Sequence, residues 1–226
     1  MKIGILQTGR TPEELQAEHG DYDDMFVQLL SNRGFEFVTY AVLDGVFPES
    51  VHDADGWLIT GSKFGAYEDH AWIPPLEDFL RAVYDSAIPI IGVCFGHQIL
   101  AQALGGKVEK FDGGWSVGAV DYQFQGLSEA RTLMAWHQDQ VVELPEDAEV
   151  IGSTDFCQNA MLAYGDKALT IQPHPEFTAE FLAALLEARR DILPQGIADA
   201  AAENLVTPLS STALADQFEA FFKKSR

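Results

Sequence analysis

A single cysteine, Cys94, ends an apolar run in residues 88–98, IPIIGVCFGHQ. The run is short, rich in isoleucine and preceded by a polar turn, which predicts a buried strand, and the following HQILAQAL has helical character. Gly92 and Gly96 stand two residues to either side of Cys94. A tight strand-to-helix turn needs such glycines, because side chains there would clash with neighbouring elements. The pattern therefore places Cys94 on a sharp elbow.

A cysteine in that position could act as a nucleophile. The free N–H groups at a helix N-terminus, together with the helix macrodipole, stabilise a thiolate. The N–H of Phe95, the next residue, is well placed to bind an oxyanion. The pattern alone is moderately specific, since a cysteine can also be a small residue of the core.

A cysteine nucleophile needs a base and a group that orients the base. Among six histidines, His174 lies in TIQPHPEF, directly after an apolar run and between two prolines, and Glu176 follows it. In an extended chain residues i and i+2 face the same side, so Glu176 can hold one imidazole nitrogen while the other faces the thiol. The alternative is a surface turn with a solvated glutamate, which the elbow disfavours. For His97, in the helix after the elbow, we expect a structural role.

The elements around these residues alternate between strand and helix in the first part of the chain. Strand-like KIGIL, FEFVTYAV and GWLIT are separated by helical YDDMFVQLLSNRG and PPLEDFLRAVYDSA. This alternation predicts a parallel sheet covered on both faces. The middle of the chain has short strand-like runs of antiparallel character, and two helical segments joined by a Pro- and Ala-rich connection end it. The acidic TGRTPEELQAEHGDYDD is expected to be a long loop.

The composition narrows the function classes. With 14 basic and 35 acidic residues the 226-residue chain has a net charge of −21, which repels nucleic acids and anionic membranes. It has no membrane-spanning apolar stretch and its start lacks the features of a signal peptide, so we expect a cytoplasmic protein and no disulfide between Cys94 and Cys157. No metal-ligand spacing or phosphate-binding loop occurs, and we predict neither a metal nor a cofactor.

The two segments GVCFGHQ and QPHPEF, in this order and spacing, resemble the class I glutamine amidotransferases. LITGSKFGAYED and WHQDQV resemble the subgroup related to the GMP synthase glutaminase domain and to stand-alone γ-glutamyl peptidases. The resemblance covers residues 2–186. It implies a flavodoxin-like, three-layer α/β fold with a mostly parallel central sheet and an antiparallel section. We expect a domain of residues 1–190 and a C-terminal helical extension of residues 191–226 packed on it.

The resemblance also implies roles for individual residues. Cys94 would attack the γ-carbonyl of glutamine or of a γ-glutamyl compound to form a thioester, His174 would move the proton and Glu176 would orient His174. Backbone N–H groups of Gly61 and Phe95 would form the oxyanion hole, and water would release glutamate. The residues implied in substrate binding are Gln98, His137, Gln138 and Asp139. Gln138 stands where many relatives have glycine, and Thr60-Gly61-Ser62 departs from their usual oxyanion loop.

Three functions remain open from the sequence. The protein could be a stand-alone hydrolase of γ-glutamyl amides or peptides, a glutaminase subunit that delivers ammonia to a separate synthase, or a regulatory binding protein. The last is disfavoured because all three residues of the catalytic set are in place. An apolar stripe in LADQFEAFF either packs back on the domain or forms a homodimer or partner contact. Phe64, Trp115 and Trp136 either line the pocket or belong to the core.

Overall fold

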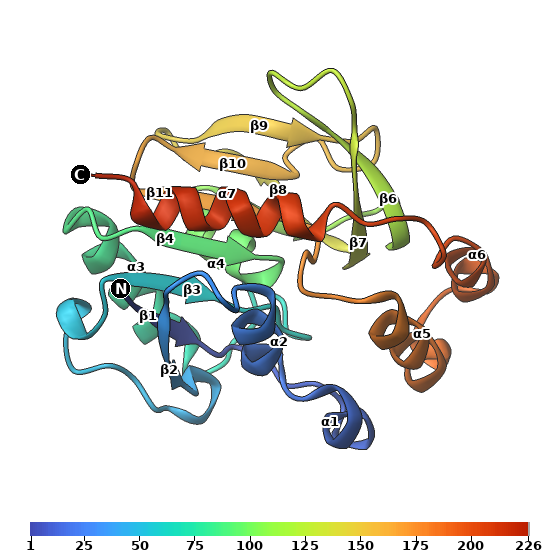
Figure 1. Ribbon diagram of the computed structural model, residues 1–226, viewed down its shortest axis with the longest axis horizontal. Coiled ribbons are helices and arrows are strands. Elements are labelled where there is room, and N and C mark those ends of the chain that lie inside the picture. The colour runs from blue at the N-terminus through green and yellow to red at the C-terminus, as the bar shows by residue number, and fades with distance from the viewer. Residues whose placement is uncertain (226) are drawn as a thin grey trace.

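The protein is built around a nine-stranded mixed sheet, seen in a computed structural model that describes residues 1–225 (Figure 1). The strand order is β2 (Glu36–Tyr40), β1 (Lys2–Leu6), β3 (Gly56–Ile59), β4 (Ile90–Val93), β11 (Ala168–Ile171), β10 (Met161–Tyr164), β9 (Glu149–Ser153), β6 (Ser116–Phe124) and β7 (Arg131–His137). Strands β2 to β11 pair in parallel, and β11 to β7 pair antiparallel. Strands β5 (Lys107–Lys110) and β8 (Asp139–Glu143) form a separate antiparallel ribbon.

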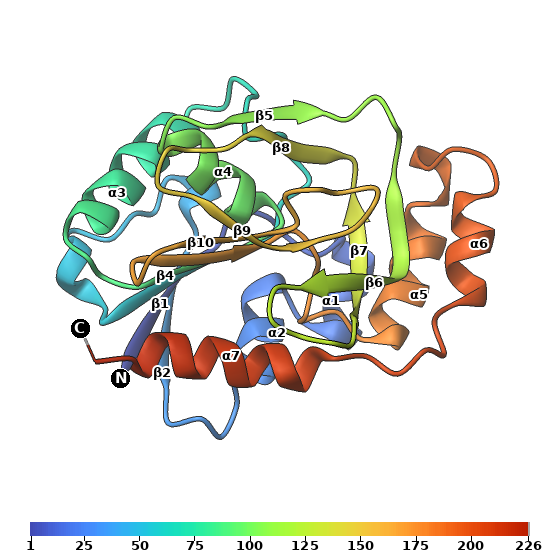
Figure 2. The ribbon, with the colours of Figure 1, turned by 90° about the horizontal axis from the view of Figure 1, so that it is seen from above.

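Helices cover both faces of the parallel half, as Figure 2 shows from above. Helices α3 (Ile73–Asp85) and α4 (Phe95–Ala103) lie on one face, and α2 (Tyr22–Leu29) and α7 (Ser211–Lys223) lie on the other. Helices α1 (Glu13–His19), α5 (Ala179–Ala188) and α6 (Ile197–Glu203) lie together at one end of the molecule. Elsewhere in the chain three single-turn helices span Val42–Asp44, Val51–Asp53 and Arg190–Ile192. The predicted three-layer α/β architecture, with a parallel centre and an antiparallel section, is confirmed.

The central strands supply side chains to two cores because their residues alternate between the faces of the sheet. In β3, Trp57 and Ile59 pack in the cluster that includes Leu80 of α3 and Leu100 of α4. Leu58 of the same strand packs in the opposite cluster, with residues from α2 and α7. Strands buried on both faces read as continuous apolar runs, which is why GWLI and IIGV carry few polar residues.

Helix α7 packs on the parallel half of the sheet through the apolar stripe. Leu214, Phe218 and Phe222 are buried there, and Phe221 is partly buried against the same cluster. A Cβ on Gly56 would lie only 2.8 Å from the Phe222 ring, so β3 needs glycine at this close approach. The stripe is thus covered by this chain's own sheet.

Two segments expected without regular structure are helical. Helix α1 lies in the acidic stretch between β1 and α2, and it buries none of its residues, so it carries no apolar periodicity. Helix α6 lies in the Pro- and Ala-rich connection and contacts the sheet mainly through Ala198 and Ala201, which add little amphipathic contrast. Within residues 1–225 no helix is long and apolar enough to cross a membrane.

Candidate active site

The predicted site residues Gly61, Cys94 and His174 meet at the carboxyl ends of the parallel strands, together with Thr8, which was not predicted. Thr8 follows β1, Gly61 follows β3, Cys94 follows β4 and His174 follows β11. Parallel strands end at the same edge of a sheet, and open α/β sheets bind ligands at that edge. This topology brings together residues that lie up to 166 positions apart, as the numbers of Thr8 and His174 give.

Cys94 occupies a strained elbow between β4 and α4. Its φ of 53° and ψ of −104° lie in a region that non-glycine residues rarely adopt. The N–H of Cys94 donates to the Ile171 carbonyl at 2.8 Å, which ties the elbow to β11. A Cβ on Gly92 would lie 2.6 Å from the carbonyl carbon of Gly96, so the turn closes only with glycine at that position. The surrounding contacts therefore hold the cysteine at the start of α4.

His174 and Glu176 form a buried hydrogen-bonded pair. His174 Nδ1–H donates to Glu176 Oε1 at 2.6 Å, and both side chains are almost fully buried. The imidazole stacks on Phe177, with ring centroids 4.0 Å apart, and its backbone N–H donates to the Met134 carbonyl at 2.8 Å. Since Glu176 occupies Nδ1, Nε2 is the nitrogen left to face the Cys94 thiol.

Charge controls the protonation of His174. Burial by itself lowers the pKa of this imidazole, but the charges of Glu176 and of Cys94, with their hydrogen bonds, raise its pKa to about 10. The surroundings of His174 therefore favour its imidazolium form.

Two other buried histidines near the site behave in the opposite way. Burial lowers the pKa of His97 to about 3 and that of His137 to about 4. His97 Nδ1 lies 2.8 Å from Thr170 Oγ1, and His137 Nδ1 donates to the Asp139 carbonyl at 3.2 Å. Neither ring has a carboxylate side chain as a hydrogen-bond partner among the described residues, so both stay neutral at physiological pH.

Gly61 lies against Cys94 and His174. A Cβ on Gly61 would be 3.0 Å from His174 Cε1 and 3.8 Å from Cys94 Cβ, so this backbone faces the thiol. The Thr8 hydroxyl donates to the Thr60 carbonyl at 2.9 Å. In a trans peptide the N–H points opposite to the C=O, so the Gly61 N–H points away from Thr8. The N–H of Phe95 has no partner inside α4, because it is the first of that helix.

The four residues implied in substrate binding all border one pocket with Cys94. This main lobe of about 200 Å³ is lined by Gln98, His137, Gln138 and Asp139, and also by Phe64, Trp115 and Trp136. Gln98 Nε2 donates to the Asp139 carbonyl and to Gln172 Oε1, both at 3.0 Å, which leaves its Oε1 to contact a ligand. The Tyr67 hydroxyl bonds the Asp139 carboxyl, whose pKa is raised by burial.

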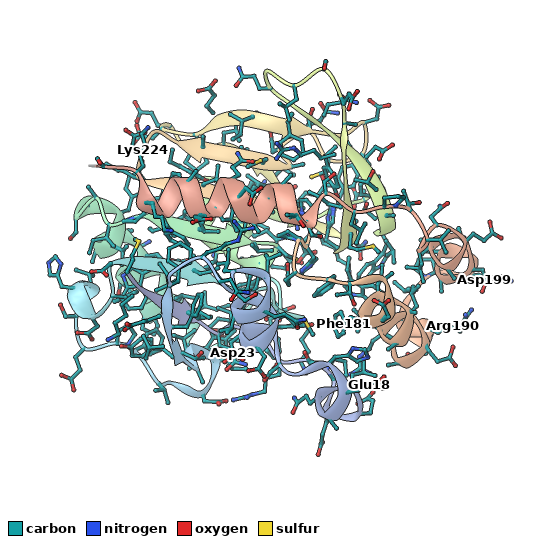
Figure 3. The ribbon with its side chains drawn as sticks, in the orientation of Figure 1. Glu18, Asp23, Phe181, Arg190, Asp199 and Lys224 are labelled. Carbon is teal, nitrogen blue, oxygen red and sulfur yellow. The ribbon has the colours of Figure 1, made fainter. Side chains whose placement is uncertain are left out.

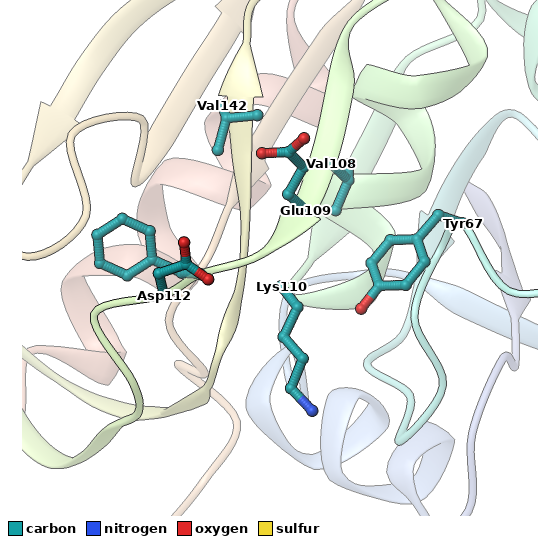
Figure 4. Close-up of a pocket in the computed structure, with 7 residues that line it drawn as sticks. Tyr67, Val108, Glu109, Lys110, Asp112 and Val142 are labelled. Atoms are coloured by element: carbon teal, nitrogen blue, oxygen red, sulfur yellow. The ribbon is translucent and has the colours of Figure 1, made fainter.

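Cys94 also borders a second, smaller hollow, which shares Ser62, Lys63, Trp136 and Ile192 with the main lobe. This His174 lobe, of about 80 Å³, is lined by His174, Phe177, Tyr22, Arg10, Lys63 and Arg189, among others. A third, wider hollow of about 690 Å³ has Tyr67 and Lys110 in its lining. Figure 4 shows the Tyr67 hydroxyl pointing toward the Lys110 side chain there.

Several residues at the site were not predicted from the sequence. Thr8 had a usable signal, because a polar residue after a buried parallel strand lies at the same edge as Cys94. Tyr22 and Arg189 had none, since Tyr22 lies in helix α2 and Arg189 ends α5, and only packing brings them to the hollow beside Cys94. Residues 1–225 contain no group of three or more His, Cys, Asp or Glu side chains that could hold a metal ion.

The sequence is similar to a known protein family and to individual members of it. The family model for glutamine amidotransferase class-I matches residues 20–187. Gamma-glutamyl peptidase 5 of Arabidopsis thaliana is 32% identical, covering 81% of this chain and 79% of that protein. Gamma-glutamyl peptidase 4 is 31% identical over 75% and 73% of the two chains. GMP synthase of Vibrio vulnificus is 31% identical over 70% of this chain and 32% of its own length.

Solved structures agree on the fold. A glutamine amidotransferase from Thermotoga maritima superposes with a TM-score of 0.77 over 98% of both chains, at 19% identity. One from Methylobacillus flagellatus gives a TM-score of 0.75 over 98% of this chain and 92% of that one, at 21% identity. The family model spans most of the sequence, and the peptidase relatives align along three quarters of the chain or more. The chain therefore belongs to the class I glutamine amidotransferase family.

Proposed function

We propose that the protein is a stand-alone cysteine hydrolase that cleaves the γ-amide bond of γ-glutamyl compounds. The observation that carries this proposal is the strained Cys94 elbow beside the buried His174–Glu176 pair. The similarity to gamma-glutamyl peptidases along most of both chains supports the reaction class. Cys94 is the nucleophile, His174 the proton carrier and Glu176 the residue that orients His174.

In the first half of the reaction the Cys94 sulfur attacks the γ-carbonyl carbon. The carbonyl oxygen becomes an oxyanion, which accepts hydrogen bonds from the backbone N–H groups of Gly61 and Phe95. His174 gives its proton to the amide nitrogen, the C–N bond breaks, and the amine leaves. The γ-glutamyl group remains on Cys94 as a thioester.

In the second half, water replaces the amine. Neutral His174 takes a proton from water, whose oxygen attacks the thioester carbonyl in the same oxyanion hole. The C–S bond breaks, glutamate leaves, and the thiolate beside imidazolium returns. Glu176 keeps the ring oriented throughout, because its hydrogen bond to Nδ1 reserves Nε2 for the proton transfers.

The main lobe holds the γ-glutamyl part of the substrate. The Gln98 amide oxygen remains available there, and the segment of His137, Gln138 and Asp139 carries a carboxylate and backbone groups suited to an α-amino and an α-carboxyl group. Lining by neutral His137 is consistent with a pocket that recognises polar groups through hydrogen bonds.

Glutamate release by the purified protein tests the proposal. The substrates are glutamine and a panel of γ-glutamyl peptides, and Cys94→Ala is the control. We expect robust, Cys94-dependent release from peptides. Activity that survives Cys94→Ala would sink the mechanism.

A second candidate is a glutaminase subunit that delivers ammonia to a separate synthase. The similarity to GMP synthase favours this candidate, because this chain aligns with only about a third of that protein. It predicts weak turnover of glutamine alone and none of peptides, with activity that rises when a synthase partner is added. Brisk peptide hydrolysis by the isolated protein excludes it.

A further inference from the structure

The two lobes at Cys94 are suited to different parts of the substrate, an inference that rests on the proposed function. Gln98, His137 and Asp139 line the main lobe and not the His174 lobe, whereas His174 lines only the latter. A general acid must lie within hydrogen-bond reach of the atom it protonates. The amine nitrogen therefore leaves on the side of His174, and whatever that nitrogen carries extends into the His174 lobe.

The His174 lobe is basic in an otherwise acidic protein. Arg10, Lys63 and Arg189 line it, and no aspartate or glutamate does; Lys63 also borders the main lobe, whereas Arg10 and Arg189 do not. The whole chain has only 14 basic residues against 35 acidic ones. The lining of this hollow is thus positive, against the overall charge, while the carboxylate partners of Arg10 and Arg189 lie outside the lining.

These cations keep donors for a ligand. Lys63 is exposed and forms no ion pair within residues 1–225, and its ammonium lies 5.2 Å from the centre of the Phe64 ring. Arg189 Nη1 donates to Glu14 at 3.1 Å, where the Glu14 side chain is 55% exposed. Arg10 bonds Asp21 and Asp44. An arginine has five N–H donors, so each can bind a further carboxylate beside its present partner.

We propose that the His174 lobe is the subsite for the leaving amine, and that Arg10, Lys63 and Arg189 select substrates whose amine part carries a carboxylate. The substrate class is then a γ-glutamyl amino acid or a short γ-glutamyl peptide with a free C-terminus. Glutamine releases ammonia, which reaches none of the three cations. The hollow is small, so the amine nitrogen and its first atoms lie inside while the carboxylate meets the exposed cations at the rim.

A matched pair of substrates tests this subsite. γ-Glutamylglycine and γ-glutamylglycinamide differ only in a carboxylate against a neutral amide at the far end of the leaving group. The readout is the ratio of kcat/KM for the first to that for the second, measured for wild type and for Lys63→Ala, Arg189→Ala and the double variant. The change in the ratio between proteins is decisive, because the different basicity of the two amines affects every protein alike.

Arg190→Gln is the matched control. Arg190 is the neighbour of Arg189 and has the same charge, but it pairs with Asp199 at 2.6 Å and lines neither lobe. Figure 3 shows the Arg190 and Asp199 side chains at the outer edge of the molecule. We expect this variant to keep the wild-type ratio. Thermal melting of every variant verifies that it folds.

We expect each single variant to lower the ratio by about three- to fivefold, because an exposed ion pair contributes up to about 1 kcal/mol. The double variant should lower it by about tenfold or more, and added salt should reduce the wild-type ratio. A ratio unchanged in the folded double variant overturns the subsite while leaving the proposed function intact. Turnover of glutamine with neither peptide cleaved overturns the subsite and also favours the glutaminase subunit over the proposed hydrolase. Absence of Cys94-dependent turnover of all three substrates overturns both.

Discussion

Two buried histidines on either side of the elbow show how neighbours decide what an imidazole does. His174, after β11, bonds Glu176 and has its pKa raised to about 10. His97, in α4, bonds the Thr170 hydroxyl and has its pKa lowered to about 3. Both rings are almost completely buried. Burial disfavours the imidazolium in each, and only the carboxylate and thiol beside His174 reverse that effect.

The comparison teaches that burial and residue type do not identify a reactive histidine. His97 follows Cys94 by three residues, yet its neutral ring points from α4 toward Thr170 of β11. His174 is distant in the sequence and lies against the thiol. The difference is a charge partner, and the following changes test the surroundings of one or the other of these histidines.

The largest effect is expected from Cys94→Ala, which removes the proposed nucleophile and one of the groups that raise the pKa of His174. We expect kcat/KM to fall by at least about 10⁴-fold, since loss of a triad nucleophile has effects of this order. Steady-state glutamate release measures it. Cys157→Ala is the matched control, because Cys157 is also a free, buried cysteine but lines neither lobe. An equal loss in Cys157→Ala would mean that unfolding, and not chemistry, explains the result.

Glu176→Gln keeps the shape of the side chain and removes its charge. We expect kcat to fall by about 10²–10⁴-fold, as for the orienting carboxylate of other triads. The pKa of His174 should fall as well, so the alkaline limb of the pH–rate profile should move to lower pH. Glu180→Gln, an exposed carboxylate in the first turn of α5, is the control. A profile that stays in place in Glu176→Gln contradicts the assigned cause of the raised pKa.

The two histidines should affect the free energy of unfolding in opposite pH ranges. The pKa of His97 is lowered, so its contribution is present above about pH 6.5 and is lost as pH falls toward 3. The pKa of His174 is raised, so its contribution is present below about pH 6.5 and is lost as pH rises toward 10.

Denaturant unfolding of wild type and His97→Gln at pH 7.5 and pH 5 tests the first half of that statement. When the pH is lowered from 7.5 to 5, the free energy of unfolding of wild type should fall by about 2 kcal/mol on account of His97. The reason is that the unfolded chain binds a proton at His97, whereas the folded chain keeps this residue neutral. In His97→Gln the loss should be smaller by about that amount. Identical losses in the two proteins would mean that His97 titrates normally in the fold.

Thr170→Val should give the smallest effect. Thr170 is buried in β11 and its hydroxyl bonds His97, so the isosteric valine leaves one polar atom without its partner. We expect a loss of about 1–2 kcal/mol in stability, while kcat should stay within about twofold. A large fall in kcat without a loss of stability would make the His97 region part of the catalytic machinery and would end the contrast with His174.

Much of the fold could be predicted because the parallel strands are continuous apolar runs bounded by turns. The strand before Cys94 and the helix after it agree with the structure, and so does the amphipathic α3. The helices α1 and α6 could not be predicted, because α1 buries no residue and α6 presents mainly alanines to the sheet. Weak amphipathic contrast leaves no period to detect.

The local parts of the site were determined by the sequence itself. Gly92, Cys94 and Gly96 specify an elbow by steric need, and His174 and Glu176 reach each other because they are two residues apart on an extended chain. Tertiary structure alone decided that Arg10, Lys63 and Arg189 surround one lobe, and that Tyr22 joins them there. The physical reason is that those contacts depend on strand order and helix packing, which no local spacing encodes.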